Sequence, residues 1–208
     1  MNSCTTCKEA IEHCMSTHTF AFAHLYGDEK IMDMHIHNCC EVYYSISGGK
    51  QFLIDHCLYD IRPGDLFLIN QFESHHLTQI DQQTHERIIL SIDPEYLSKL
   101  STGATDLGHC FSFRDTRMPH QIHLSPKEQN RFMYFIHELH DDGGMGEDLL
   151  DQAIFLELMV FLNRAFAARC TDAATPAPAP SSNYHAQVDA ILSYINSNIG
   201  EPLTLAGL

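Results

Sequence analysis

One short segment, HIHNCCE, holds the residues best suited to chemistry. Side chains alternate between the two faces of an extended strand, so His35, His37 and Glu41 are expected to point to the same side. Two imidazoles and one carboxylate are a suitable ligand set for a divalent metal. His75, which follows a later predicted strand, supplies a fourth donor. The predicted metal ligands are therefore His35, His37, Glu41 and His75, and the predicted cofactor class is a divalent transition metal (Zn, Ni, Fe or Mn).

The same four side chains also suit a polar pocket that holds an organic ligand without metal, or simple packing. His24 shares a strand face with Phe20 and Phe22. Tyr43, like those two phenylalanines, is either a core aromatic or an effector contact. We therefore predict one ligand-binding set, consisting of His24, His35, His37, Glu41, Tyr43 and His75. We find no pairing of a nucleophile with a base, so we predict no catalytic residue.

The eight cysteines are expected to be reduced thiols, because the chain is long and begins without a secretion signal. Cys4, Cys7 and Cys14 are spaced closely enough for a zinc or redox site, but a single CxxC is a weak signal. Cys39 shares the parity of His37 if the strand is unbroken. It then either lines the pocket or fills a small buried space.

The elements that carry these residues are short strands. Phe20–Tyr26 and seven later runs up to residue 92 are rich in β-branched and aromatic residues, and Gly, Pro, Asp and Gln turns separate them. This pattern predicts a barrel or sandwich. We assign residues 1–124 to this unit, including a short helix within residues 5–18 and another at residues 95–100, with an irregular stretch up to about residue 123.

Two helices are predicted over residues 125–170. Ser125-Pro126-Lys127-Glu128 combines a capping box with proline in the first turn, which is a specific helix start. The second helix, from about residue 147 to residue 168, is apolar over most of its circumference, so we expect it to contact both the β-unit and a partner chain. The predicted dimerisation residues are Leu150, Ile154, Leu158, Phe161 and Leu162.

Residues 171–183 form a Pro/Ala-rich linker, and residues 184–208 begin a further helical unit. Such a short unit cannot bury a core of its own, so we expect part of a second domain to be missing. The net charge of −15 opposes binding to phosphate, and any DNA binding is expected to come only from that missing part. No segment predicts a membrane span or a signal peptide, which indicates a cytoplasmic protein with no membrane partner.

The order His-x-His-x3-Glu-x6-Gly, then Pro-Gly-Asp at 63–65 and a histidine at 75, resembles the two motifs of the cupin superfamily. With two helices, a linker and a final Pro-Leu-Thr-Leu-x-x-Leu, the whole chain resembles the AraC/XylS family of transcription regulators. The resemblance implies a protein that is mainly β with C-terminal helices: a cupin-like double-stranded β-barrel that binds a small-molecule effector, then an α-helical dimerisation pair. It also implies that helix-turn-helix units after the linker bind DNA. The chain departs from the cupin motifs before His35 and after His75.

Two functions remain to be compared. The first is the ligand-sensing and dimerisation portion of an AraC-type regulator, which is not an enzyme. The second is a metal-dependent cupin enzyme of the dioxygenase or isomerase type. A free enzyme needs no linker that leads into an amphipathic helix, so the sequence favours the sensor.

Overall fold

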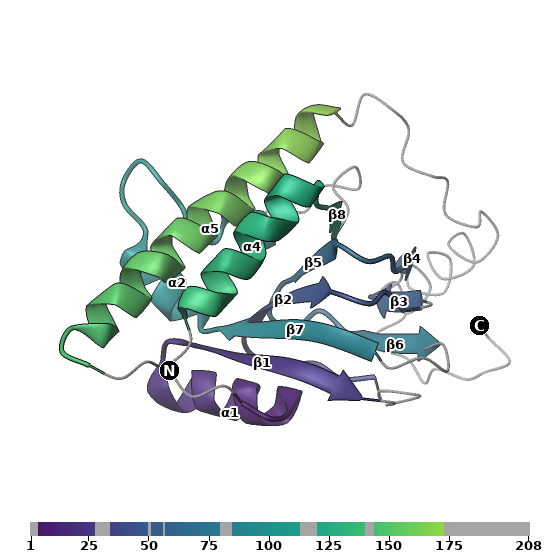
Figure 1. Ribbon diagram of the computed structural model, residues 1–208, viewed down its shortest axis with the longest axis horizontal. Coiled ribbons are helices and arrows are strands. Elements are labelled where there is room, and N and C mark those ends of the chain that lie inside the picture. Colours follow the sequence, from purple (N-terminus) through teal and green to yellow (C-terminus); the bar gives the residue numbers. More distant parts are fainter. Residues whose placement is uncertain are drawn as a thin grey trace, which may run out of the picture.

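The computed structural model describes residues 4–27, 34–49, 51–55, 57–79, 85–112, 120–139 and 144–172, with side chains described up to Arg169. Strands dominate the first part and helices the last (Figure 1). In chain order the elements are α1 (Cys7–Thr17), β1 (Phe20–Gly27), β2 (Cys40–Ser45), β3 (Gln51–Ile54), β4 (Cys57–Asp60), β5 (Asp65–Ile69), β6 (His75–Gln79), β7 (His85–Ile92), α2 (Pro94–Leu100), α3 (His109–Ser112), β8 (Gln121–His123), α4 (Pro126–Glu138) and α5 (Glu147–Asp172).

The strands form two antiparallel sheets. One has the order β1-β7-β2-β5-β8 and the other has the order β4-β3-β6. The predicted class, mainly β with C-terminal helices, is confirmed at this level. The short strand β8 was not predicted, because three residues are too few to show a period of two.

The HIHNCCE segment is not the continuous strand that we expected. His35 forms only an isolated bridge with His75, residues 38 and 39 bend, and β2 begins at Cys40. The carbonyl of His37 accepts a hydrogen bond from the backbone of Phe72 at 2.9 Å, which replaces a strand ladder there. The N-terminal part of the predicted strand, residues 31–33, lies outside the described residues.

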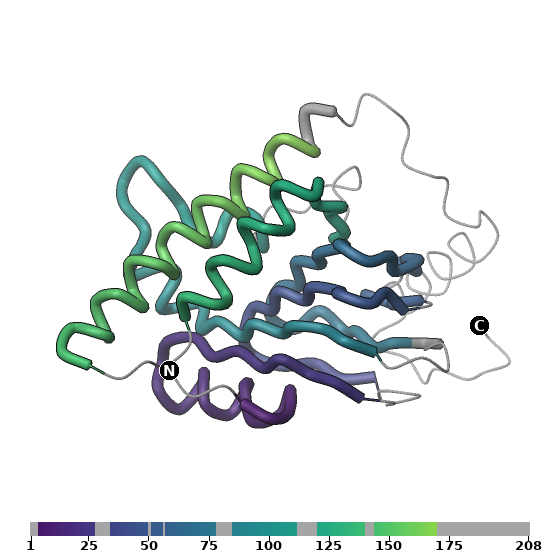
Figure 2. Tube along the Cα trace, in the orientation of Figure 1, coloured from purple at the N-terminus to yellow at the C-terminus, as the bar shows by residue number. Residues whose placement is uncertain are grey.

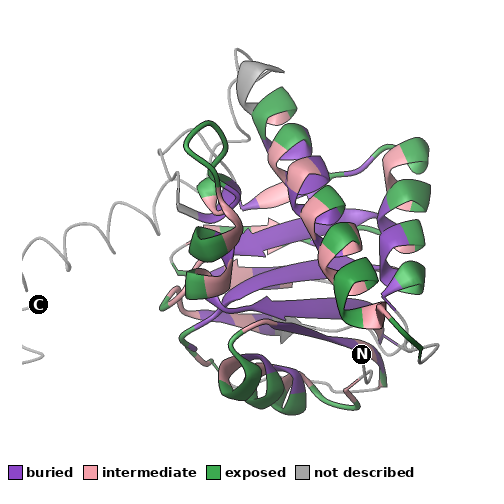
Figure 3. Ribbon diagram, turned by 90° about the vertical axis from the view of Figure 1, so that its left-hand side faces the viewer, coloured by how far each residue is buried: buried purple, intermediate pink, exposed green. Residues whose placement is uncertain are grey.

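The larger sheet is buried on both faces. Its even-numbered residues on β1, β2 and β7, such as Phe22, Val42 and Leu90, pack with the helices. Its odd-numbered residues, such as Tyr43 and Ile89, pack against the smaller sheet. Figure 3 shows the resulting pattern, with most of the larger sheet buried and the helices exposed on their outer sides.

Helices α1, α2, α4 and α5 begin close to where the sequence predicts, whereas α3 lies in a stretch that was predicted to be irregular. Asp93 caps α2, and Ser125 and Glu128 form the complete capping box of α4. The tube in Figure 2 shows α4 and α5 running side by side across the sheet, with α1 at its far edge. Within the described residues, no helix has the combination of length and apolarity that a membrane crossing requires.

Three of the predicted dimerisation residues are core residues of this chain. Leu158, Phe161 and Leu162 are 0%, 7% and 0% exposed, because α5 lies over the larger sheet and beside α4. They leave almost no surface for a partner, which corrects our expectation. Leu150, 67% exposed, and the half-buried Ile154 remain available. Beyond Asp172, the predicted linker and the unit at 184–208 lie outside the described residues.

Candidate functional site

Three of the predicted donors meet at one point. His35, His37 and His75 each offer a ring nitrogen, and these three atoms lie within 4.8 Å of one another. The bridge between His35 and His75 brings two distant segments side by side, and the bend after His37 turns its ring toward them. We predicted that His35 and His37 share an orientation because they alternate along one strand. In the structure they face the same point because His35 pairs with His75 and the chain bends after His37.

The hydrogen bonds of the rings fix which nitrogen faces the cluster. His75 Nδ1 lies 2.9 Å from the carbonyl of Glu73, and His37 Nδ1 lies 2.9 Å from the carbonyl of Cys39. A carbonyl only accepts, so both Nδ1 atoms must carry the proton. The Nε2 atoms of both rings are then directed to the cluster, an arrangement typical of metal-binding histidines.

Glu41 completes the cluster from β2. Its side chain is 1% exposed, and its Oε2 lies 3.1 Å from His37 Nε2 and 3.8 Å from His75 Nε2. Burial by itself would raise the pKa of Glu41, but the hydrogen bond from His37 and the nearby imidazoles hold that pKa below its usual value. A buried carboxylate of this kind is stable only beside a cation or a strong donor.

The two inner histidines differ in basicity. Burial opposes the charged form of His37, but the Cys39 thiol and the Glu41 carboxylate outweigh it and raise the pKa of His37 to about 10. Burial lowers the pKa of His75 below its usual value, despite the attraction of Glu41. The pKa values of these two histidines are thus shifted in opposite directions by their surroundings.

Cys39 lies behind the cluster, with its sulfur 3.3 Å from His37 Nδ1. A hydrogen bond from Cys14 on α1 and the neighbouring His37 lower the pKa of the Cys39 thiol to about 6, although burial opposes this. Cys14 and Cys39 are both fully buried. In the described part of the chain, Cys4 and Cys7 join no group of three ligating side chains.

The cluster fits a divalent metal ion. His75 Nε2 is buried and has no hydrogen-bond partner, which is costly unless a ligand uses it. The nitrogens of His35, His37 and His75 with the carboxylate of Glu41 are the donor types that Zn, Ni, Fe and Mn accept in proteins. His35 is only half-buried, which leaves an approach from solvent.

Two predicted ligand residues lie elsewhere. Tyr43 is packed between Phe52 and Phe67, with ring centroids 4.9 and 5.8 Å away, and its hydroxyl bonds to His85. His24 lies on the strand face of Phe22 and binds Glu86 at 2.9 Å, near the far end of β1. The structure does not bring either side chain into the histidine cluster.

Sequence reasoning missed a polar group beside the cluster. His120 lies 3.3 Å from the Glu73 carboxylate through Nε2 and 2.8 Å from the Tyr59 hydroxyl through Nδ1. The carbonyl of the same Glu73 orients His75. His120 stands just before β8, which was not predicted, so no sequence signal indicated this contact.

The family comparison gives a clear result. The model of the AraC-like ligand binding domain matches residues 19–159. The chain belongs to this family. The AraC/XylS resemblance is thereby confirmed, and the chain is a ligand-sensing portion of an AraC-type regulator. The match covers both sheets and extends into α5.

Solved structures are similar at low identity. ToxT from Vibrio cholerae is 11% identical, with a TM-score of 0.49, over 90% of this chain and 68% of that chain. Oxalate decarboxylase from Bacillus subtilis is 21% identical, with a TM-score of 0.33, over 36% of this chain and 21% of that chain. DMSP lyase DddQ from Ruegeria pomeroyi is 21% identical, with a TM-score of 0.32, over 36% and 38%. The chain thus spans about a fifth of the decarboxylase. No curated protein sequence matches it.

Proposed function

We propose that this AraC-type sensor binds its small-molecule effector at the cluster of His35, His37, Glu41 and His75. The observation that carries the proposal is the buried, unpartnered Nε2 of His75, directed at the same point as His37 Nε2 and Glu41. A divalent transition metal bound there would supply a positive centre for donor atoms of the effector. The buried side chains of Glu41 and His75 and the half-buried His35 would hold that centre.

The response to the effector requires two arrangements of the protein that bind it with different affinity. Among the described residues, an isolated bridge joins the HIHNCCE segment to β6, and a ligand at the cluster would add a further link between these two parts. We propose that the two sheets act as the effector-binding barrel over residues 1–124, followed by the helical pair at 125–170, the linker at 171–183 and the start of the DNA-binding unit at 184–208. DNA contact would come from that C-terminal part.

We further propose a homodimer that uses the first turns of α5. Leu149 and Leu150 are more than half exposed there, as is Met145 just before the helix, and Ile154 continues the apolar surface. Exposed apolar side chains gathered on one helix end are typical of an interface. This surface takes the place of Leu158, Phe161 and Leu162, the three buried members of the predicted set of five.

Metal uptake by the full chain tests the proposal. We expect the wild-type protein to bind Zn²⁺ or Ni²⁺, and the His35→Ala/His37→Ala variant to lose roughly 100-fold or more in affinity by titration calorimetry. His24→Ala is the matched control, because it removes a histidine that lies outside the cluster, and it should bind like wild type. Circular dichroism should show all three proteins folded.

Uptake at wild-type affinity in the double variant would discard the site. If metal binds and the loaded protein turns over a substrate, the enzymatic alternative replaces the sensor. If metal does not bind to the wild type, the cluster is left as a polar pocket for an organic effector, and the metal part of the proposal fails.

A further inference from the structure

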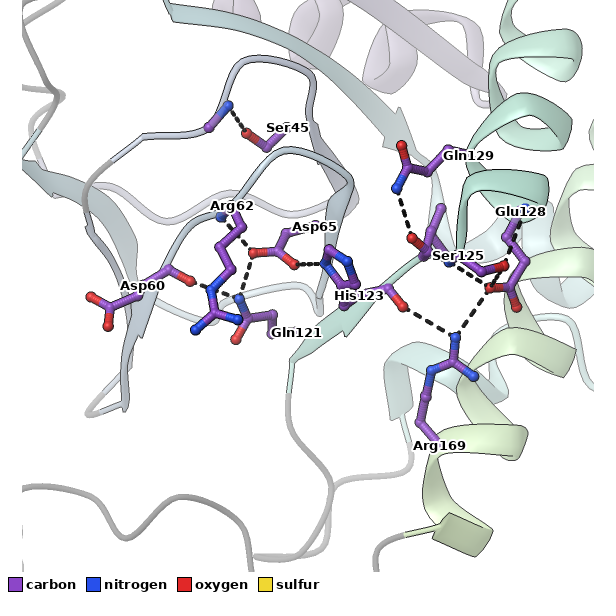
Figure 4. A network of polar contacts seen from close by, with 12 residues as sticks. Ser45, Asp60, Arg62, Asp65, Gln121, His123, Ser125, Glu128, Gln129 and Arg169 are labelled. Carbon is purple, nitrogen blue, oxygen red and sulfur yellow. Dashed lines mark hydrogen bonds and ion pairs between the residues drawn. The ribbon is translucent and has the colours of Figure 1, made fainter.

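Two turns flank β5, and they share one pattern of hydrogen bonds. In turn 62–65, the N–H of Asp65 donates to the carbonyl of Arg62 at 3.1 Å, and the Asp65 carboxylate accepts the N–H of Arg62 at 2.6 Å (Figure 4). In turn 70–73, the fourth residue, Glu73, makes the same two contacts with the first residue, at 3.4 and 2.6 Å. The two turns are therefore held in the same way.

The third residue of each turn has a left-handed backbone, where glycine or asparagine is usual. The φ angle is +86° at Gly64 and +63° at Phe72. Glycine adopts this conformation readily, and an added Cβ at Gly64 would collide with the side chain of Gln129. At Phe72 the same conformation crowds the Cβ against the following carbonyl, so a phenylalanine there is strained.

The side chain of Phe72 contributes little to the packing of the domain. It is 61% exposed, and within the described ranges its ring stacks on no other aromatic ring. An exposed aromatic side chain gains little free energy from burial. A residue that is both strained and exposed points to a role in binding rather than in folding.

Turn 70–73 is bonded to two histidines of the cluster. The N–H of Phe72 donates to the carbonyl of His37 at 2.9 Å, and the carbonyl of Glu73 accepts from His75 Nδ1 at 2.9 Å. The turn thus links the two segments that carry these imidazoles, and Phe72 is held next to the cluster by the backbone of one of its ligands.

Ile36 offers a comparison at the same site. It is also 61% exposed, and it lies between His35 and His37 in the chain. Because the rings of these two histidines meet, the side chain between them is expected on the opposite side of the extended chain. Ile36 is therefore an apolar residue of equal exposure that should face away from a ligand at the cluster.

We propose that Phe72 is a specificity-determining residue, and that the effector joins a metal-coordinating polar head to an apolar ring. This inference rests on the proposed function, because the head would bind at the histidine cluster. The effector's ring would pack on Phe72 in an offset or edge arrangement. The histidines would then select the head of the effector, and Phe72 its apolar part.

Two hydroxamates with the same head test this proposal on the Zn²⁺-loaded full chain. Acetohydroxamate and benzohydroxamate both coordinate Zn²⁺ through their oxygens, and they differ only in a methyl or a phenyl group. By titration calorimetry, we expect benzohydroxamate to bind the wild type roughly tenfold more tightly than acetohydroxamate does. In Phe72→Asn this preference should fall to about twofold or less, because the ring contact is lost. Acetohydroxamate should bind Phe72→Asn as it binds the wild type.

Ile36→Asn is the matched control, since it makes the same kind of change at an equally exposed residue, and it should keep the wild-type preference. Urea unfolding separates a binding role of Phe72 from a structural one. Asparagine adopts a left-handed backbone readily, so Phe72→Asn should be at least as stable as the wild type.

A phenyl preference that persists in Phe72→Asn, that is lost equally in Ile36→Asn, or that is absent from the wild type would overturn the proposal. A marked loss of stability in Phe72→Asn would assign the ring to the fold, and a shift in its sedimentation would assign the ring to a contact between chains. Either result also overturns the proposal. If the wild type takes up no Zn²⁺, the metal part of the proposed function fails before either hydroxamate is added, and this inference fails with it.

Discussion

The two faces of the larger sheet are buried to a similar degree but with different kinds of side chain. The face under the helices is lined by apolar residues such as Phe20, Val42 and Ile88. The face toward the smaller sheet also buries charged and polar residues, namely Glu41, Ser45, Asp65, His85, Arg87 and Ser91, and the buried His37 and His75 lie next to Glu41.

This difference shows how the fold separates stability from chemistry. Each Å² of buried apolar surface stabilises the fold by about 25 cal/mol, and this contribution needs no specific hydrogen-bond partner. Any apolar side chains of suitable shape can therefore fill the helix-covered face. A buried polar group costs free energy unless a partner satisfies it, so it is retained where a ligand or a hydrogen bond uses it. The helix-covered face therefore stabilises the domain, and the inner face holds the site.

The largest effect is expected from a cavity on the helix-covered face. Phe155 is 0% exposed, and its ring stacks on Phe20 with centroids 4.2 Å apart. Phe155→Ala should lower the free energy of unfolding by about 3–5 kcal/mol in urea titrations. Metal uptake per folded molecule should be retained, since the histidine cluster lies on the other face. Loss of uptake with little loss of stability would show that the two faces are not separate in function.

Neighbouring tyrosines on β2 give a sharper test. Tyr43 faces inward and bonds to His85, whereas Tyr44 packs against Phe132 of α4, with centroids 4.6 Å apart. Tyr43→Phe removes the partner of a buried imidazole and should cost about 1–2 kcal/mol. Tyr44→Phe should cost less than about 0.5 kcal/mol, because no hydrogen bond of its hydroxyl occurs among the described contacts. If urea unfolding shows that Tyr43→Phe and Tyr44→Phe lower the free energy of unfolding equally, the two faces of the sheet do not differ in their need for hydrogen-bond partners.

The smallest change in stability is expected on the outer side of the helical layer. Leu150→Asp should alter the free energy of unfolding by no more than about 0.5 kcal/mol, because Leu150 is 67% exposed. Sedimentation should nevertheless shift from dimer toward monomer. Leu58→Asp, at an exposed site on β4, is the control and should remain dimeric. A dimer that persists in Leu150→Asp would place the interface elsewhere.

Local sequence signals predicted much of the framework. The capping box at Ser125 and Glu128 depends only on residues within one turn, and it forms as expected. The strands from β1 to β7 lie in the β-rich runs, and on the larger sheet alternate residues enter two different apolar clusters. The helix at 147–168 was also found, but its pattern could not distinguish a core face from a partner face, as Leu158 and Leu162 show.

The histidine cluster was only half predictable. His35, His37 and Glu41 are close in sequence, and their spacing indicated a shared site. The position of His75 depends on a bridge between segments forty residues apart, and the orientation of its ring depends on the carbonyl of Glu73. His120 contacts the side chain of Glu73, and the sequence around His120 has no pattern that predicts a helix or a strand.

The sequence alone determined the types of donor available, the alternation that builds two sheets, the helix starts and the acidic charge, since each depends on neighbouring residues or on simple counts. The tertiary structure decided which imidazole nitrogens face one another, which apolar side of α5 is left for a partner, and that four cations gather along α4 and α5, namely Lys127, Arg131, Arg164 and Arg169. These outcomes depend on contacts between distant segments. Local pattern cannot specify such contacts, because packing and pairing decide them only when the whole domain has formed.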